Sequence, residues 1–273
     1  MKLKIGISPC PNDTFIFDAI YNNTIDCWPY EFEFVFEDVE TLNKMAEQHE
    51  IDILKLSYAQ YFNVMNDYIM LQSGSALGYG VGPLLIAKNK IDLETIETKK
   101  IAIPGKHTTA LFLLQYAFPL ASNQIEYNFA QIEQAVIDEE VDTGVIIHEN
   151  RFTYAKKGLQ KLMDLGEYWE TKTNLPIPLG GIAIKRSLDS TIQTHINELI
   201  QMSILFSQSN LPEISDFVRC HAQEMDVDVI IQHINLYVND NTLQIDTKGI
   251  EAVEHMANIL NRTSSLNLFI EQV

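Results

Sequence analysis

The sequence predicts an α/β fold of two lobes, with the larger lobe assembled from both ends of the chain. Its 273 residues exceed the roughly 150 of an average domain. Strand-like apolar runs alternate with helical stretches, an order typical of a mainly parallel sheet. Glycine- and proline-rich segments at 73–83 and 176–181 are the expected crossings between lobes, although the first also fits an ordinary surface loop. We therefore expect a larger lobe at 1–88 plus 182–273 and a smaller lobe at 89–181.

The expected elements follow in order along the chain. A β-rich run at 2–8 leads through a proline-containing turn into an apolar helix at 14–21. Phenylalanine recurs at every second position of 31–37, the period of a strand with one buried face, and Asp38 can cap the helix that follows. Further strands are expected at 51–56, 100–103 and 141–147. Amphipathic helices are expected at 189–206, 211–224 and 250–260.

Charge and cysteine content narrow the range of partners. Acidic residues outnumber basic ones 37 to 19, so a nucleic-acid backbone would be repelled over most of the surface. The three cysteines are odd in number and lack CxxC spacing, which favours a reducing compartment. Prolines interrupt the first apolar stretch, and no run of 18 apolar residues follows. We expect a cytoplasmic protein that binds a small molecule, without nucleic acid or membrane as a partner.

Four polar clusters stand at or just after the ends of expected strands. They are Asn12-Asp13-Thr14, Lys55-Leu56-Ser57, His107-Thr108-Thr109 and His148-Glu149-Asn150-Arg151. Ligands of parallel α/β sheets bind outside the carboxyl ends of the strands. Two clusters belong to each expected lobe, so closure of the lobes would bring all four around one cleft.

Each cluster also has a purely structural interpretation. The helix that follows residue 109 begins with free N–H groups, which attract carboxylate or phosphate oxygens, but Thr108 or Thr109 could equally be a simple N-cap. Asn12 and Asp13 are favoured in turns and caps as well as in ligand sites. Lys55 stands in an apolar run and must extend outward or meet an acidic group or a ligand.

His148 ends an apolar strand, which places an imidazole at the rim of the expected cleft. Histidine is the natural general base near neutral pH, although a lone histidine is more often structural. The run that starts at His148 does not fit the HExxH zinc motif. Because GxSxG, GxGxxG and paired-cysteine motifs are also absent, an α/β-hydrolase, a dinucleotide enzyme or a redox protein is disfavoured.

Six motifs together are similar to those of one enzyme family. They are 8–17 (SPCPNDTFIF), 37–43 (EDVETLN), 55–58 (KLSY), 80–83 (GVGP), 104–109 (PGKHTT) and 146–154 (IIHENRFTY). Nearly end to end, the chain resembles the 1,4-dihydroxy-6-naphthoate synthases of the futalosine route to menaquinone. Two positions depart from the pattern, since Asn150 stands where a small residue such as serine is expected and Lys106 where arginine is common.

The resemblance implies a two-lobed, periplasmic-binding-protein-like (type II) fold with the ligand cleft between lobes. It also implies that His148 is the general base of a lyase that releases 1,4-dihydroxy-6-naphthoate from cyclic dehypoxanthinyl futalosine. The expected substrate contacts are Lys55, Leu56, Ser57, Thr108, Thr109 and Asn12. No metal or other cofactor is implied, and the oligomeric state stays open. Two alternatives are a non-catalytic binding protein of the same fold and chorismate dehydratase, which acts earlier in the pathway.

Overall fold

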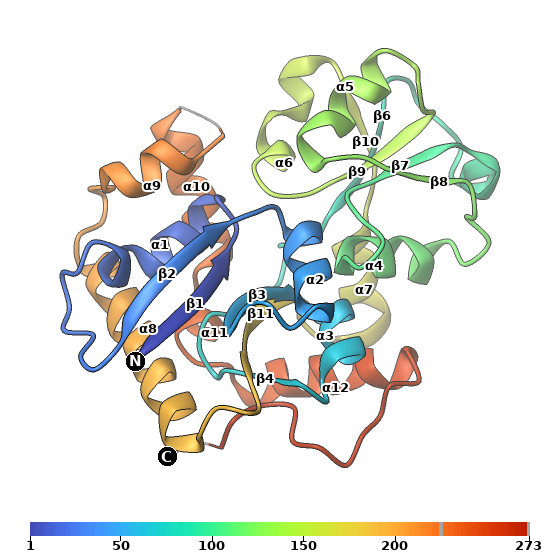
Figure 1. The fold of residues 1–273 in the computed structure, drawn as a ribbon. Helices are drawn as coiled ribbons and strands as arrows, with labels where there is room; N and C mark the ends of the chain where they lie inside the picture. Colours follow the sequence, from blue (N-terminus) through green and yellow to red (C-terminus); the bar gives the residue numbers. More distant parts are fainter. Residues whose placement is uncertain (224–225, 272–273) are drawn as a thin grey trace. The chain divides into compact units, whose positions relative to one another are not determined.

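The computed structural model describes residues 1–223 and 226–271 and divides the chain into two units. Unit 1 is Met1–Gly78 with Pro178–Val273, and unit 2 is Tyr79–Ile177. In Figure 1 the blue and the orange-to-red ends of the chain both belong to unit 1. The boundaries fall at 78 and 177, where the sequence suggested 88 and 181. The reason is that strand β6 (Leu84–Ala87) pairs with two strands of the second sheet.

Unit 1 contains one mixed sheet. Its strands are β1 (Lys2–Ile7), β2 (Glu31–Phe36), β3 (Ile53–Ser57), β4 (Tyr68–Met70), β5 (Ala76–Gly78) and β11 (Ile177–Lys185). The order is β2-β1-β3-β11-β4, with β5 paired to β11. β1 runs parallel to β2 and β3, whereas β11 is antiparallel to β3 and β4. The expectation of a mainly parallel sheet was therefore wrong, because β11, on which the chain returns to unit 1, is antiparallel to β3 and β4.

The helices of unit 1 cluster at both ends of the chain. They are α1 (Pro11–Tyr21), α2 (Val39–Glu47), α3 (Tyr58–Val64), α8 (Ser190–Ser209), α9 (Asp216–His221), α10 (Val227–Tyr237), α11 (Asp240–Leu243) and α12 (Thr247–Ile259). Asp38 caps α2 by accepting hydrogen bonds from the amides of Glu40 and Thr41, as expected. The helix expected at 211–224 is shorter, because the Ser215 side chain caps its start at Asp216. The last residue of that expectation lies outside the described residues.

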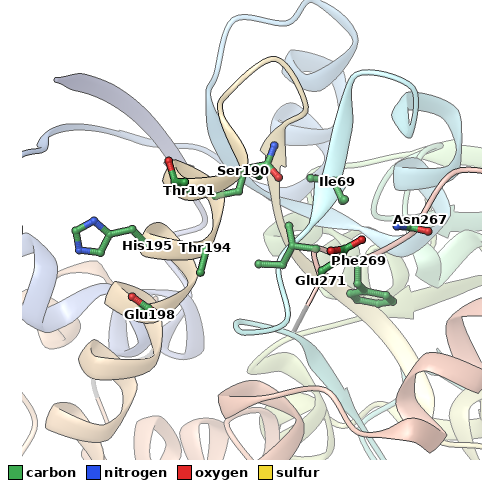
Figure 2. A pocket seen from close by; sticks show the side chains of 11 residues that line it. Ile69, Ser190, Thr191, Thr194, His195, Glu198, Asn267, Phe269 and Glu271 are labelled. Atoms are coloured by element: carbon green, nitrogen blue, oxygen red, sulfur yellow. The ribbon is translucent and has the colours of Figure 1, made fainter. Parts of the chain in front are cut away.

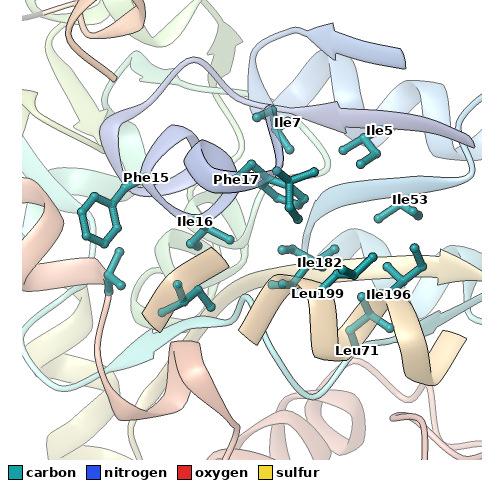
Figure 3. Packing of buried hydrophobic residues seen from close by; sticks show 14 of the residues in the cluster. Ile5, Ile7, Phe15, Ile16, Phe17, Ile53, Leu71, Ile182, Ile196 and Leu199 are labelled. Carbon is teal, nitrogen blue, oxygen red and sulfur yellow. The ribbon is translucent and has the colours of Figure 1, made fainter. Parts of the chain in front are cut away.

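The core of unit 1 forms where the sheet meets α1 and α8. Ile5, Ile53 and Ile182 contribute from the strands, Phe17 from α1 and Leu199 from α8, and all are buried. Figure 3 shows these side chains gathered between the strands and the two helices. The period-two and helical patterns of the sequence therefore bury their apolar faces against one another. This packing fixes the carboxyl ends of β1 and β3 side by side.

Unit 2 contains a second mixed sheet in the order β10-β6-β9-β7-β8. Its other strands are β7 (Ile101–Ile103), β8 (Gln124–Glu126), β9 (Thr143–Ile146) and β10 (Gln160–Asp164). Its helices are α4 (Thr109–Ala117), α5 (Ile132–Ile137), α6 (Asn150–Thr153) and α7 (Leu165–Thr173), with 3-10 turns η1 (Leu93–Thr98), η2 (Phe129–Gln131) and η3 (Tyr154–Lys157). β7 is parallel to β8 and β9, and β6 is antiparallel to β9 and β10. Across residues 1–223 and 226–271, no helix is long and apolar enough to cross a bilayer.

Candidate functional site

In unit 1 the first two polar clusters lie at the same edge of the sheet. β1 and β3 are parallel neighbours, with Ile5 opposite Ile53 and Gly6 opposite Leu54. Parallel neighbours end at the same edge, so the turn into α1 and the end of β3 are adjacent. The sheet therefore brings together three of the expected contact positions of this unit, Asn12, Lys55 and Ser57.

Lys55 meets an acidic partner inside the unit. Its Nζ lies 2.9 Å from Oδ1 of Asp13 and 3.2 Å from the carbonyl oxygen of Gly74. The residues are 6% and 2% exposed, so the ion pair is shielded from water. An ammonium group has three donors, and these two acceptors are the partners of Lys55 among the residues that the structure describes. One donor of Lys55 is thus available to a ligand.

Asp13 and Asn12 belong to a buried polar network and not to a helix cap. The N-cap residue of α1 is Cys10, with no side-chain capping bond. Oδ2 of Asp13 accepts hydrogen bonds from the hydroxyl of Ser8 at 2.6 Å and from its amide at 3.3 Å. Oδ1 accepts from Nδ2 of Asn12 at 2.9 Å, beside Lys55. The capping interpretation of these two residues therefore does not hold, and the network holds the Asp13 carboxylate in place.

Ser57 is held by a residue that lies outside the four polar clusters. The Ser57 amide donates to Oδ1 of Asn43 at 3.0 Å, and Nδ2 of Asn43 donates to the Ser57 hydroxyl at 3.0 Å. Asn43 is fully buried on α2. The feature of the sequence that could have identified it is its place in the 37–43 motif. Leu56 has a fully buried side chain and pairs with Gly181 of β11. Only the main chain of Leu56 is therefore suited to contact a polar ligand.

In unit 2 the other two clusters also share one sheet edge. β7 and β9 are parallel neighbours, with Ile101 opposite Thr143 and Ala102 opposite Gly144. The segment that follows β7 leads into α4, and the segment that follows β9 leads into α6. The structure thus places 104–109 next to 148–151 within this unit.

Thr108 is the N-cap of α4. Its hydroxyl accepts a hydrogen bond from the amide of Leu111 at 3.2 Å and donates to the carbonyl of Gly105 at 2.8 Å. The structural interpretation of Thr108 is therefore confirmed, and its single hydroxyl proton is already used. Thr109 is the first residue of α4 and is 3% exposed. The positive end of the α4 dipole still favours a bound anion near Thr109.

His148 lies in the turn that follows β9, two residues before α6 begins. Its backbone has φ +56°, in the left-handed region that non-glycine residues seldom occupy. The half-buried ring packs edge-on against Phe129, with centroids 4.9 Å apart and planes at 64°. The turn ends the strand direction of the backbone at His148, and the contact with Phe129 limits the rotation of the imidazole ring.

Hydrogen bonds and ion pairs to buried or part-buried partners hold the segment after His148. Nδ2 of Asn150 donates to Oε2 of Glu133 at 2.6 Å, and Nζ of Lys157 lies 2.7 Å from the same oxygen. Glu133 is 2% exposed and lies on α5, and nothing in its local sequence signalled this contact. Arg151 donates to the carbonyl of Gly82 and pairs with Asp164 at 3.2 Å. Asn150, one of the departures from the family pattern, thus has a defined partner.

A pocket elsewhere on unit 1 contains none of these residues. Its volume is about 540 Å³, and Figure 2 shows it beside the start of α8, with Ser190, Thr191 and His195 on one side and Phe269 on the other. Ile69 on its wall pairs with Ile184, which in turn pairs with the first residue of β3. The pocket therefore lies toward the amino end of β3, away from Lys55 and Ser57.

Two α/β units joined by two crossings of the chain define a periplasmic-binding-protein-like fold. The periplasmic aliphatic sulphonate binding protein from Escherichia coli has the same fold, with a TM-score of 0.65, 11% identity, and coverage of 95% of this chain and 86% of that chain. A crystal structure of a protein from Archaeoglobus fulgidus is more similar, with a TM-score of 0.89, 33% identity, and coverage of 96% and 98%. The expected fold class is confirmed.

The chain belongs to the menaquinone biosynthesis family, whose model matches residues 3–262. A relative from Thermus thermophilus is 42% identical over 93% of this chain and 92% of its own length. A relative from Streptomyces coelicolor is 40% identical, with coverage of 92% and 90%. Both are named 1,4-dihydroxy-6-naphtoate synthase, so the resemblance found in the motifs is confirmed.

Proposed function

We propose that this chain is a lyase that converts cyclic dehypoxanthinyl futalosine to 1,4-dihydroxy-6-naphthoate, with His148 as its general base. The observation that carries the proposal is the 42% identity, over nearly the whole of both chains, to a relative named for this product. The site supports it, because each unit gathers the expected residues at the carboxyl edge of its parallel strands.

In the proposed reaction, His148 removes a proton from the substrate, and the bond between the ring system and the sugar-derived fragment breaks. The electron pair that the proton leaves behind forms a carbon–oxygen double bond on the departing fragment, and the pair of the broken carbon–carbon bond enters the ring system, which becomes the aromatic dihydroxynaphthoate. The protonated imidazole returns its proton to the products, so the step needs no oxidant or reductant. A positioned general base contributes about 10²–10⁴-fold to such a step. Release of an aromatic product supplies driving force.

The remaining residues have binding roles in this proposal. Lys55 directs its third N–H donor to a substrate oxygen, and Ser57 and Asn12 offer further polar contacts beside it. Leu56 contributes through its main chain. In unit 2, the amides at the start of α4 and the Thr109 hydroxyl hold a substrate oxygen, while Thr108 shapes the helix end.

The decisive experiment is turnover of cyclic dehypoxanthinyl futalosine by the purified chain, followed by the absorbance of the released naphthoate. We expect His148→Asn to lower kcat by at least 100-fold with little change in substrate binding by calorimetry, since only the base is lost. His255→Asn is the matched control, because His255 lies on α12 of unit 1 and belongs to none of the four polar clusters. Near-wild-type kcat in His148→Asn would remove His148 from this role.

Two other outcomes would replace the proposed function. Binding of the cyclic substrate without release of naphthoate by the wild-type chain would indicate a non-catalytic binding protein. Loss of water from chorismate would indicate the dehydratase. We propose a cytoplasmic enzyme without metal or cofactor, which is checked by cell fractionation and by unchanged turnover after dialysis against EDTA.

A further inference from the structure

A chain of buried hydrogen bonds connects helix α10 with the end of β3. Nε2 of His233 lies 2.8 Å from Oδ1 of Asn12, although 221 positions separate the two residues. Nδ2 of Asn12 donates to Oδ1 of Asp13 at 2.9 Å, and the same oxygen lies 2.9 Å from Nζ of Lys55. No motif of the sequence includes His233, yet its bond to Asn12 is the first in a series of contacts that ends at Lys55, a proposed substrate contact.

The direction of each hydrogen bond follows from the ion pair. An ionised carboxylate only accepts, so Asn12 must present its Nδ2 to Asp13. The amide oxygen of Asn12 then faces His233, which must carry a proton on Nε2 to donate to it. The imidazole thus fixes the orientation of the Asn12 amide, and the amide fixes the oxygen that binds Lys55.

Burial makes this chain rigid. His233 is fully buried, and Asn12, Asp13 and Lys55 are 5%, 2% and 6% exposed. The His233 ring packs against Tyr237 of the same helix, with centroids 4.6 Å apart, which restricts its rotation. Hydrogen bonds between buried side chains restrict them to few arrangements.

We propose that His233 is a positioning residue for substrate binding: through Asn12 and Asp13 it fixes the ammonium of Lys55 with one donor directed to the substrate. The inference rests on the proposed function, in which Lys55 contacts the substrate. The hydrogen bond of His233 ends on Asn12, so we expect its effect on the ligand to pass through Asn12, Asp13 and Lys55.

Three variants test this role by kinetics. His233→Phe keeps a ring but removes the donor, and we expect kcat/KM to fall at least tenfold, mainly through a higher KM. His233→Gln keeps an N–H near the position of Nε2 and should return kcat/KM to within threefold of wild type. Tyr68→Phe is the control, since it removes one buried hydrogen bond, to the carbonyl of Ile51, at the other end of the sheet. The kcat/KM of Tyr68→Phe should stay within twofold of wild type.

A second measurement needs no substrate. In protein labelled with ¹⁵N-lysine, the ammonium signal of Lys55 is assigned by its loss in Lys55→Arg. We expect His233→Phe and Asn12→Ala to shift this signal and Tyr68→Phe to leave it unmoved. If wild-type protein fails to turn over the cyclic substrate, the proposed function fails while this measurement still tests the positioning role.

The proposal is overturned if His233→Phe keeps both kcat/KM within twofold and the Lys55 signal unmoved. If His233→Phe does not fold, Asn12→Ala decides, because it cuts the same chain of hydrogen bonds and keeps the His233 ring on α10. An unmoved Lys55 signal in Asn12→Ala overturns the proposal. A shifted signal together with rescue by His233→Gln supports it.

Discussion

Oδ1 of Asp13 and Nζ of Lys55 lie 2.9 Å apart, and neither side chain is more than 8% exposed. Both oxygens of the carboxylate are occupied, because Ser8 donates to Oδ2 and Asn12 to Oδ1. The ion pair is therefore a fixed part of unit 1, on which both fold stability and the placement of a cation at the end of β3 depend.

Removal of either partner leaves a buried charge, so we expect Asp13→Asn and Lys55→Met each to cost about 3–5 kcal/mol of unfolding free energy. The double variant should cost less than the sum of the single variants, with a coupling of about 1–3 kcal/mol. Urea unfolding followed by circular dichroism measures both. Additive single effects would mean that the two charges do not stabilise one another.

An exposed ion pair provides the control for that cycle. Nζ of Lys2 lies 2.7 Å from Oε2 of Glu33, but the side chains are 66% and 46% exposed. Solvent screens such a pair, so Lys2→Met should leave the unfolding midpoint nearly unchanged.

The contact between Glu133 and Asn150 predicts an effect on both stability and turnover. Glu133→Gln replaces the charged acceptor of the 2.6 Å hydrogen bond from Asn150, so we expect unit 2 to lose about 1.5–3 kcal/mol. We also expect kcat to fall, because α6 begins two residues after His148. The emission of Trp169, which is fully buried in unit 2, follows the unfolding of that unit.

Lys157→Met distinguishes the two partners of Glu133. Lys157 is 45% exposed, so solvent screens its charge. Its removal should lower the unfolding free energy much less than removal of the Glu133 carboxylate. Equal losses of unfolding free energy in Lys157→Met and Glu133→Gln would mean that the ion pair, and not the hydrogen bond to Asn150, stabilises unit 2.

Asp18 predicts a pH dependence of stability. Burial raises the pKa of its carboxyl above the ordinary 3.8, against the opposing effect of hydrogen bonds from Ser215 and Asn22. A raised pKa means that the folded state favours the protonated form of Asp18. The protonated carboxyl therefore stabilises the fold fully below pH 3.8, and this stabilisation is lost as pH rises through the raised pKa. Asp18→Asn resembles the protonated form and keeps the Oδ1 acceptor.

We therefore expect the Tm of Asp18→Asn to rise relative to wild type as pH increases from acid to neutral. Calorimetric scans of both proteins across this range measure the difference. A difference that is flat, or that moves the other way, would contradict the raised pKa.

The sequence was sufficient to locate most elements that form the site. The strands that end near Ser8 and Ser57, and the helix that begins beside Thr108, follow from alternation and capping residues. Helix α10 was missed, although Asp226 caps it and its apolar residues recur at helical spacing. The predicted boundary at 88 placed the 84–87 run in the larger lobe, but it forms β6 of unit 2, and an apolar run alone does not indicate which of two sheets buries it.

Side-chain partners were not predictable in the same way. Lys55 needed an acidic group or a ligand, but the choice of Asp13 depends on which strands are neighbours. The bond between His233 and Asn12 depends on how α10 packs on α1, which no local pattern encodes. The same holds for Glu133, whose contact with Asn150 joins two elements of unit 2. Local patterns therefore give the elements, whereas tertiary packing decides the contacts.

Gly82 and Gly166 approach each other backbone to backbone in unit 2, which gives a last prediction. A Cβ added to Gly82 would lie 2.3 Å from the Cα of Gly166, and no rotamer change can relieve a contact with main chain. We expect Gly82→Ala to lose at least the roughly 1–3 kcal/mol typical of overpacking. Gly80→Ala is the control, because an added Cβ there meets no atom within 4 Å and only the positive φ of 71° opposes it.

Both glycine variants are measured by Trp169 emission during urea unfolding, since Trp169 follows Gly166 on α7 and is fully buried. Trp28, the other tryptophan, is 80% exposed in unit 1 and adds a nearly constant background. The carbonyl of Gly82 also accepts a hydrogen bond from Arg151, three residues after His148. A backbone shift at Gly82 should therefore lower kcat as well as stability. Equal losses in the two variants would show that the strained backbone of this segment, and not its close packing, limits the stability of unit 2.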